Sequence, residues 1–313
     1  MQHPLNSIEW AEYKKTLDHW FSLEINGIPM VFKSFPCLGK LGMIYMFPII
    51  ENEALLEASM QKLFVLFKKS ELDYLLVKPF LLIEQEKFCD KFSKLMPRDL
   101  LISELPKIAL GYKDTYVVDL TIGMEGCFKN FSSTKRNEIR RIEKSTGISI
   151  QINEDIDWDE FYEHYSKSMI AKIAPLLSKE RVNYIFRAFN ENHNLLLIKA
   201  SNKVDGAKFF TCCLLNDGIG LYLFGAYDRS DNLISKMIPK YTLYLAMKKM
   251  AETNYSYFDL GGIDLADPRK SGINDFKKGF GGVASSSHCF LLARSSNRIR
   301  AKLMEIILKI KGV

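Results

Sequence analysis

One pattern of predicted secondary structure occurs twice along the chain, and this repeat constrains the fold more than any other feature of the sequence. In the first copy, apolar stretches at residues 28–33 and 43–47 predict two strands joined by a turn that contains glycine and proline. Helical periodicity follows over residues 54–69, and the short apolar run at residues 74–77 predicts a buried strand. The order is hairpin, helix, strand.

The second copy has the same order at a similar spacing. Residues 208–215 and 220–226 predict two strands on either side of a turn at 216–218. Residues 234–253 have helical periodicity, and residues 257–260 predict a strand that ends at a pair of glycines. A strand followed by a helix and a second strand is typical of a crossover unit with parallel outer strands. Two such units predict tandem α/β domains.

The length of 313 residues gives room for two domains of ordinary size. We expect the first domain at residues 1–131, with residues 292–313 returning to it, and the second domain at residues 132–291. The segment between the two copies contains further predicted elements, namely a strand at 115–120, a basic helix at 132–145, a strand at 148–152, and helices at 158–172 and 178–189.

Charge and hydropathy exclude several classes of protein. The chain has 43 Lys and Arg against 37 Asp and Glu, a net charge of +6, so a protein that coats nucleic acid is not expected. The apolar stretch at residues 41–50 is interrupted by Gly42 and Pro48 and is too short to cross a bilayer, and the first ten residues do not resemble a signal peptide. We expect a cytoplasmic protein, either free or at the inner face of the membrane.

Cysteine and histidine do not form a ligand pattern. The six cysteines contain no CxxC pair and the five histidines have no metal-ligand spacing, so we expect neither a metal site nor a disulfide framework. Cys212 and Cys213 lie in an apolar run, which favours core thiols over a catalytic role.

A glycine pair and a lysine pair follow the last strand of the second copy. Gly261 and Gly262 permit either a sharp turn or a close approach of the backbone to a ligand. Ligands of α/β sheets bind at the carboxyl ends of strands, which is where this pair stands. Lys277 and Lys278 come soon after, between aromatic residues and glycines. Either one ammonium group is held beside the ligand, or both are solvated in a loop.

These motifs resemble a known family. The runs LYLFGA at 221–226, YFDLGGI at 257–263 and FKKGFGG at 276–282 are similar to the C-terminal signature of the Fem family, and TYVVDL at 115–120 and KRNEIRR at 135–141 also resemble it. Fem proteins are peptidyltransferases that use aminoacyl-tRNA to build peptidoglycan cross-bridges, and they consist of two GNAT-type acyltransferase domains. The resemblance covers roughly residues 110 to 290 well and the first hundred residues only in outline.

The resemblance implies an α/β fold of two tandem GNAT-like domains, each with a mixed central sheet and flanking helices, without the coiled-coil arm of some members. It implies that Lys277 stabilises the oxyanion with support from Phe276. It also implies a substrate-binding set, which comprises Tyr222, Phe224, Asp259, Gly261, Gly262, Lys179 and Arg181. Compact members often have an arginine four residues before the tyrosine that matches Tyr184. This chain has Glu180 there, so a muropeptide acceptor does not follow from the resemblance.

The loop at residues 228–236 decides between two classes of donor. Classical GNAT enzymes hold the pyrophosphate of coenzyme A in a glycine-containing loop at a helix N-terminus. This loop has no glycine and carries Asp228 and Asp231, which disfavours coenzyme A. We therefore expect no resident cofactor, and the resemblance implies aminoacyl-tRNA as the acyl donor.

Two basic helices have alternative interpretations. Arg136 and Arg140 are four residues apart and share a helix face, so they either grip phosphates of tRNA or a nucleotide, or belong to a solvated face. The amphipathic segment at residues 294–311 either lies on an anionic membrane surface, where a lipid-linked acceptor would be found, or docks on its own first domain.

The sequence thus predicts an N-acyltransferase that moves an aminoacyl or acyl group onto an amine of a nucleotide- or lipid-linked cell-wall precursor. Its partners are aminoacyl-tRNA and that precursor. Two alternatives remain: an acyltransferase that depends on acyl-coenzyme A or acyl-carrier protein and acts on an amino sugar, and a non-catalytic module that binds tRNA or envelope precursors.

Overall fold

The computed structural model describes residues 1–47, 49–52, 54–82, 88–89, 92, 94–95, 97–105, 111–153, 157–172 and 174–311. The chain forms two compact units. The first comprises Met1–Thr115, Gly262–Lys270 and Val283–Val313, and the second comprises Tyr116–Gly261 and Ser271–Gly282. The sequence placed the boundary at residue 131, whereas here the chain enters the second unit within a strand, at Tyr116.

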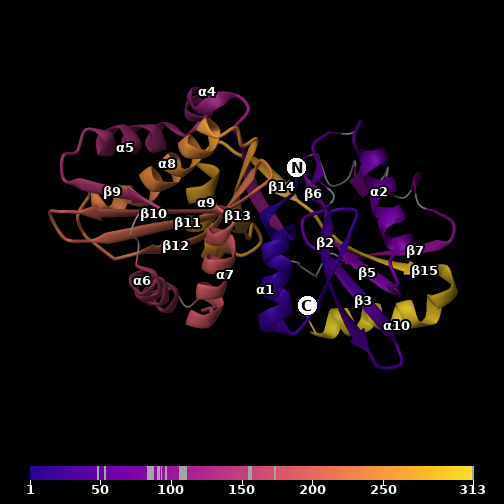
Figure 1. Ribbon diagram of the computed structural model, residues 1–313. Helices are drawn as coiled ribbons and strands as arrows, with labels where there is room; N and C mark the ends of the chain where they lie inside the picture. The colour runs from indigo at the N-terminus through magenta and orange to yellow at the C-terminus, as the bar shows by residue number, and fades with distance from the viewer. Residues whose placement is uncertain are drawn as a thin grey trace. The chain divides into compact units, whose positions relative to one another are not determined.

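The first unit is built on a six-stranded sheet with the order β1-β2-β3-β5-β15-β7 (Figure 1). The sheet consists of β1 (Phe21–Ile25), β2 (Ile28–Phe35), β3 (Gly39–Ile44), β5 (Tyr74–Val77), β7 (Leu100–Leu105) and β15 (Cys289–Arg294). The residues of this unit also include β4 (Ile49–Ile50) and β6 (Phe80–Leu81), which pair with each other, and β14 (Val283–Ser286). Its helices include α1 (Ile8–Asp18), α2 (Leu56–Lys69) and α10 (Arg298–Lys311).

The second unit arranges its strands in the order β8-β13-β12-β11-β10-β9. These strands are β8 (Asp114–Asp119), β9 (Ile148–Ile152), β10 (Leu195–Asn202), β11 (Lys208–Asn216), β12 (Ile219–Tyr227) and β13 (Tyr257–Ile263). Its helices are α4 (Gly123–Asn130), α5 (Ser133–Glu143), α6 (Trp158–Ala171), α7 (Lys179–Glu191), α8 (Ile238–Glu252) and α9 (Ser271–Lys278). Figure 1 shows α5 and α8 on one face of this sheet, and α6 and α7 on the other.

The order of elements in the predicted repeat is confirmed, although the strand expected at residues 43–47 lies earlier, at Gly39–Ile44. In the first unit, the β2-β3 hairpin leads through α2 into β5, which pairs with β3 in parallel. In the second unit, the β11-β12 hairpin leads through α8 into β13, which pairs with β12 in parallel. The sequence therefore predicted both crossover units and the tandem α/β fold class correctly.

Each unit has its own apolar core. Leu63 and Phe67 of α2 pack with Leu75 and Leu292 from the sheet of the first unit. Because side chains alternate along a strand, Leu291 points to the opposite face from Leu292, which is the face that α10 covers. The expectation that residues 294–311 contact their own first domain is thus met by one side of α10.

The helix predicted at 234–253 begins later than expected. A short 3-10 turn (Ser235–Met237) precedes α8, which starts at Ile238 and has Pro239 in its first turn. The Asn232 side chain accepts hydrogen bonds from the backbone N–H groups of Ile234 and Ser235, at 2.9 and 3.4 Å. This cap holds the residues before Ile238 in a tighter turn than an α-helix.

Candidate active site

The parallel strands β12 and β13 separate inside the second unit. They pair at three positions, the last of which joins Leu221 to Asp259, although both strands continue beyond it. Gly261 lies just past this point with a φ of +73°, and a Cβ atom there would lie 2.6 Å from the Tyr222 carbonyl oxygen. Only glycine permits both this left-handed conformation and so close an approach. Of the two glycines singled out in the sequence, Gly261 is therefore required by its backbone conformation and by its close approach to Tyr222.

Lys277 lies beside the point where the strands separate. It stands in the last turn of α9, where adjacent residues point about 100° apart. Its side chain is consequently 6% exposed, whereas Lys278 is exposed to solvent. The Lys277 Nζ lies 3.6 Å from the position of a Cβ at Gly261 and 5.8 Å from the centre of the Tyr222 ring. The segment is a helix, and the structure distinguishes the two lysines by burial.

Burial and a nearby carboxylate set the charge of Lys277. Removal from water lowers the pKa of Lys277 to about 8, and the negative charge of Asp259 partly opposes this decrease. Asp259 is completely buried, and its Oδ1 accepts a hydrogen bond from the Gly261 N–H at 2.8 Å. Lys277 is therefore a largely protonated, desolvated cation at neutral pH.

Tyr222 forms another wall of the site. Its hydroxyl packs on Gly225, where a Cβ would lie 2.0 Å from the oxygen, and burial raises the pKa of Tyr222 well above its ordinary value. The phenol therefore stays neutral and can donate a hydrogen bond. Cys213 pairs with Tyr222 and Cys212 with Phe224, so Leu223 has no opposite residue. This bulge changes the direction of the side chains along β12.

The structure brings Tyr222, Asp259, Gly261 and Lys277 together, whereas the described contacts of Phe224 and Gly262 are with other residues. The Phe224 ring lies 5.0 Å from the Tyr165 ring and 6.5 Å from the Phe161 ring, so it packs against α6. Gly262 belongs to the first unit, where a Cβ would meet the Tyr112 side chain at 2.7 Å.

Lys179 and Arg181 begin α7. The Lys179 ammonium pairs with Asp159 of α6 at 2.9 Å, with both side chains largely exposed. The backbone N–H of Arg181 donates to the capping Ser178 Oγ at 3.3 Å. The role of Lys179 and Arg181 in substrate binding stays a prediction.

Phe276 contacts a second buried cation, Lys135, and its expected support of Lys277 stays a prediction. The Lys135 Nζ lies 4.3 Å from the centre of the Phe276 ring and 5.3 Å from that of Phe280. Burial, followed by the positive charge of Lys240, lowers the pKa of Lys135 to about 8, although Glu138 opposes the decrease. In the described part of the chain, the Lys135 Nζ forms no hydrogen bond or ion pair.

Sequence reasoning missed Lys135 as a site residue. A signal was present, because Lys135, Ile139 and Ile142 follow helical spacing and are the buried residues of α5. A lysine on the apolar stripe of an amphipathic helix indicates a buried cation, and such a group is a candidate for a functional site.

The two arginines proposed to grip phosphate both contact α4. The Nη1 group of Arg136 donates to the carbonyl oxygens of Lys129, at 2.8 Å, and Phe131. The Arg140 guanidinium lies 5.3 Å from the centre of the Phe128 ring. These contacts join α5 to the end of α4, which gives both residues a structural role besides the phosphate role expected of them.

The two adjacent thiols of β11 are unsuited to nucleophilic chemistry. Cys212 and Cys213 are completely buried, and burial raises the pKa of both thiols. Among the described residues, no group of three or more His, Cys, Asp or Glu side chains is arranged to hold a metal ion. The helices in the described ranges are all too short or too polar to span a bilayer.

The arrangement of the chain matches solved structures. A crystal structure of FemX superposes with a TM-score of 0.73 over 96% of this chain and 94% of that one, at 16% sequence identity. The chain has the fold of FemX. The Fem-type fold expected from the motifs is therefore confirmed.

Two further structures are similar across nearly the whole chain. A conserved protein of unknown function from Bacteroides thetaiotaomicron has a TM-score of 0.55 and 14% identity, covering 94% of this chain and 92% of its own. The C-terminal domain of a putative lysylphosphatidylglycerol synthetase from Agrobacterium fabrum has a TM-score of 0.53 and 11% identity, with coverage of 98% and 94%. No protein-family model and no curated protein matches the sequence.

The two buried lysines make stability depend on pH. Their pKa is about 8 in the folded protein and 10.5 for an ordinary lysine in water, so the unfolded state binds more protons between these values. The free energy of unfolding should therefore rise with pH in this window, by up to about 1.4 kcal/mol per pH unit for each lysine. Urea unfolding just below pH 8 and at about pH 9.5 measures this slope. If the Lys135→Met/Lys277→Met variant shows the same increase of unfolding free energy with pH as the parent, groups other than these two lysines cause it.

Proposed function

We propose that the protein transfers an aminoacyl group from aminoacyl-tRNA to an amine of a cell-wall or envelope precursor. The observation that carries this proposal is the buried, protonated Lys277 beside the separation of β12 and β13. The acceptor nitrogen attacks the carbonyl carbon of the donor ester, and the carbonyl π electrons move to the oxygen. The resulting oxyanion is the group that a desolvated ammonium stabilises most strongly.

The remaining steps require little from the protein. The tetrahedral intermediate collapses with loss of the ribose hydroxyl, which takes up a proton, while the attacking nitrogen loses one to water or to a substrate carboxylate. The Tyr222 phenol stays neutral at any physiological pH, so it is suited to donate a hydrogen bond to the same oxygen as Lys277. Asp259 preserves the charge of Lys277 and fixes the Gly261 backbone.

The loop after β12 supports an aminoacyl donor over coenzyme A. Within this loop, the Asp228 carboxylate accepts a hydrogen bond from the Lys208 N–H at 2.9 Å and lies 3.3 Å from the His164 ring nitrogen. A glycine cradle for a pyrophosphate is absent from residues 228–236, all of which the structure describes. One similar structure is named for lysylphosphatidylglycerol, an aminoacylated lipid, which also favours an aminoacyl group.

One feature favours the alternative donor. A cavity of about 200 Å³ beside this loop is lined by Lys167, Lys172 and Arg229, together with Asp228. Three cations at one cavity could hold the phosphates of coenzyme A. However, Lys167 pairs with Glu163 at 2.5 Å, and Arg229 donates to the Ala171 carbonyl at 2.9 Å. These contacts reduce the charge that is available to a ligand.

Calorimetric titration distinguishes the donors. Because the loop offers no backbone cradle for phosphate, acetyl-coenzyme A should show no binding tighter than ~100 μM, which corresponds to about 5.5 kcal/mol. Charged tRNA should bind more tightly and donate its amino acid. A micromolar dissociation constant for acetyl-coenzyme A, together with acetyl transfer to an amino sugar, would replace this proposal with the coenzyme A alternative.

A further inference from the structure

Helix α10 has two apolar faces, and only one of them packs against the protein. Met304 and Leu308 are buried against the first unit, as is most of Glu305. In contrast, Ile299, Leu303, Ile306 and Ile310 are 80%, 47%, 46% and 78% exposed. Their spacing of four, three and four residues places all four on a single face of the helix. At 100° per residue, this face is centred opposite the buried one.

Basic side chains flank the exposed stripe on both sides. The helical angle places Arg298, Lys302 and Lys309 along one flank and Arg300 along the other. The described side chains of α10 include one carboxylate, Glu305, which pairs with Lys302 at 3.1 Å and with Lys309 at 2.5 Å. Glu305 lies at the buried side of the helix, so the flanks present net positive charge to solvent.

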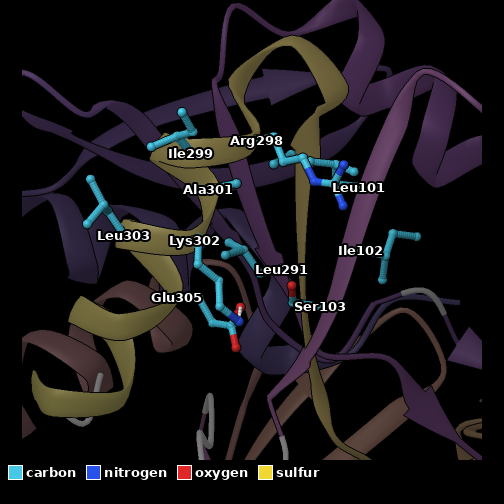
Figure 2. Close-up of a pocket in the computed structure, with 11 residues that line it drawn as sticks. Leu101, Ile102, Ser103, Leu291, Arg298, Ile299, Ala301, Lys302, Leu303 and Glu305 are labelled. Carbon is cyan, nitrogen blue, oxygen red and sulfur yellow. Dashed lines mark hydrogen bonds and ion pairs between the residues drawn. The ribbon is translucent and has the colours of Figure 1, made fainter.

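The apolar surface continues beside the helix. A cavity of about 530 Å³ opens where α10 packs beside β7 and β15, and apolar groups from both sides line it. Figure 2 shows Ile299 and Leu303 on the helix and Leu101 and Ile102 on the facing strand β7. Arg298 and Lys302 stand at the same cavity. Large exposed apolar surfaces with polar rims mark interaction sites.

We propose that α10 docks the protein on an anionic lipid bilayer, with its stripe inserted among the acyl chains and its arginines and lysines at the headgroups. An apolar ridge between two basic flanks is the pattern of helices that lie in a membrane interface. Long basic side chains reach the headgroup phosphates while their aliphatic parts stay in the apolar region. The inference does not depend on the reaction that the second unit catalyses.

Charge argues against a second copy of the chain as the partner. Two copies related by a two-fold axis along this stripe would bring the basic flank of one helix near that of the other. The one carboxylate of the described helix, Glu305, is 7% exposed and already pairs with two lysines. A self-complementary contact would therefore place like charges together, whereas a bilayer that contains acidic lipid neutralises them.

Sedimentation of the full chain with lipid vesicles tests the proposal. The protein should bind vesicles made of equal parts phosphatidylglycerol and phosphatidylcholine, and binding should weaken with added salt. The triple variant Ile299→Ser/Leu303→Ser/Ile310→Ser should bind at least ~tenfold more weakly, because these side chains supply the insertion. The Arg298→Gln/Arg300→Gln variant should lose roughly tenfold in affinity for the acidic vesicles. Vesicles of phosphatidylcholine alone should bind the parent weakly.

Val204→Ser is the matched control. Val204 lies on the second unit and is 77% exposed, so this substitution removes a similar exposed apolar group away from α10. It should bind vesicles like the parent. Thermal unfolding of every variant should match that of the parent, since the changed side chains are exposed. Parent protein that stays in the supernatant with acidic vesicles would overturn the proposal. A dimer in sedimentation velocity that the triple variant dissociates would also overturn it, since the stripe would then be a protein interface.

Discussion

Replacing Lys277 by methionine should lower the turnover of acyl transfer by ~10²-fold or more, which corresponds to roughly 2.7 kcal/mol of transition-state stabilisation. Methionine retains most of the volume of the side chain but not its charge. Because the ammonium acts mainly on the developing oxyanion, the Michaelis constant for the acceptor should change little. Steady-state kinetics with saturating donor measure both quantities.

Lys278→Met is the control for this experiment. The two lysines are adjacent in α9, yet Lys277 is buried and Lys278 is exposed. Lys278→Met should therefore retain nearly all of the activity. Equal losses in the two variants would show that Lys277 has no special role. The substitution removes the positive charge that neighbours the buried Asp259 carboxylate, which could destabilise the fold. Thermal unfolding of Lys277→Met checks that the variant remains folded.

The pH profile gives the same variant a second readout. The pKa of about 8 for Lys277 predicts that parental turnover falls as pH rises above about 8, because the ammonium loses its proton. Lys277→Met should lack this alkaline decrease. Lys135 has a similar pKa, so a Lys135→Met variant that keeps the decrease assigns it to Lys277.

Replacing Gly261 by alanine should destabilise the second unit and disrupt the site. The new Cβ would lie 2.6 Å from the Tyr222 carbonyl oxygen, and the φ of +73° is unfavourable for alanine. The backbone must move at the point where β12 and β13 separate, which displaces both Tyr222 and Lys277. We expect a loss of about 2–4 kcal/mol in unfolding free energy and at least tenfold in turnover.

Gly206→Ala separates steric clash from backbone strain. Gly206 has nearly the same φ, +70°, but nothing lies within 4 Å of its Cβ position. It should therefore lose only the 1–2 kcal/mol of the left-handed conformation and retain full turnover. Urea unfolding and initial rates of both variants measure the difference. If Gly261→Ala loses no more stability and no more activity than Gly206→Ala, the close approach to Tyr222 is not required for stability or turnover.

Local patterns were sufficient to predict most of the fold. The strand at residues 148–152 and the helix that starts at Trp158 agree with the structure, because hydrophobic periodicity reports which face of an element is buried. The domain boundary was not predictable in the same way. It falls within β8, a continuous strand without a change in composition.

The candidate site was predictable only in part. The Fem resemblance singled out Lys277, but burial is what separates it from Lys278, and burial depends on how α9 docks. Lys135 reads as a surface residue within a basic helix until its ring contacts with Phe276 and Phe280 are known. The sequence also did not show that Arg136 donates hydrogen bonds to the carbonyl oxygens of Lys129 and Phe131 at the end of α4. The burial of Lys277 and Lys135 depends on tertiary packing, which local sequence patterns do not report.

The most direct test of the account is the transfer of a labelled amino acid from charged tRNA to an envelope-precursor fraction. Treatment with mild alkali distinguishes the two possible products. The amide formed with an acceptor amine survives this treatment, whereas an aminoacyl ester is hydrolysed. The account predicts that the parent and Lys278→Met produce alkali-stable label on the precursor, while Lys277→Met produces it at ~1% of the parental rate. Absence of alkali-stable label with every charged tRNA, or equal rates for the parent and Lys277→Met, would contradict it.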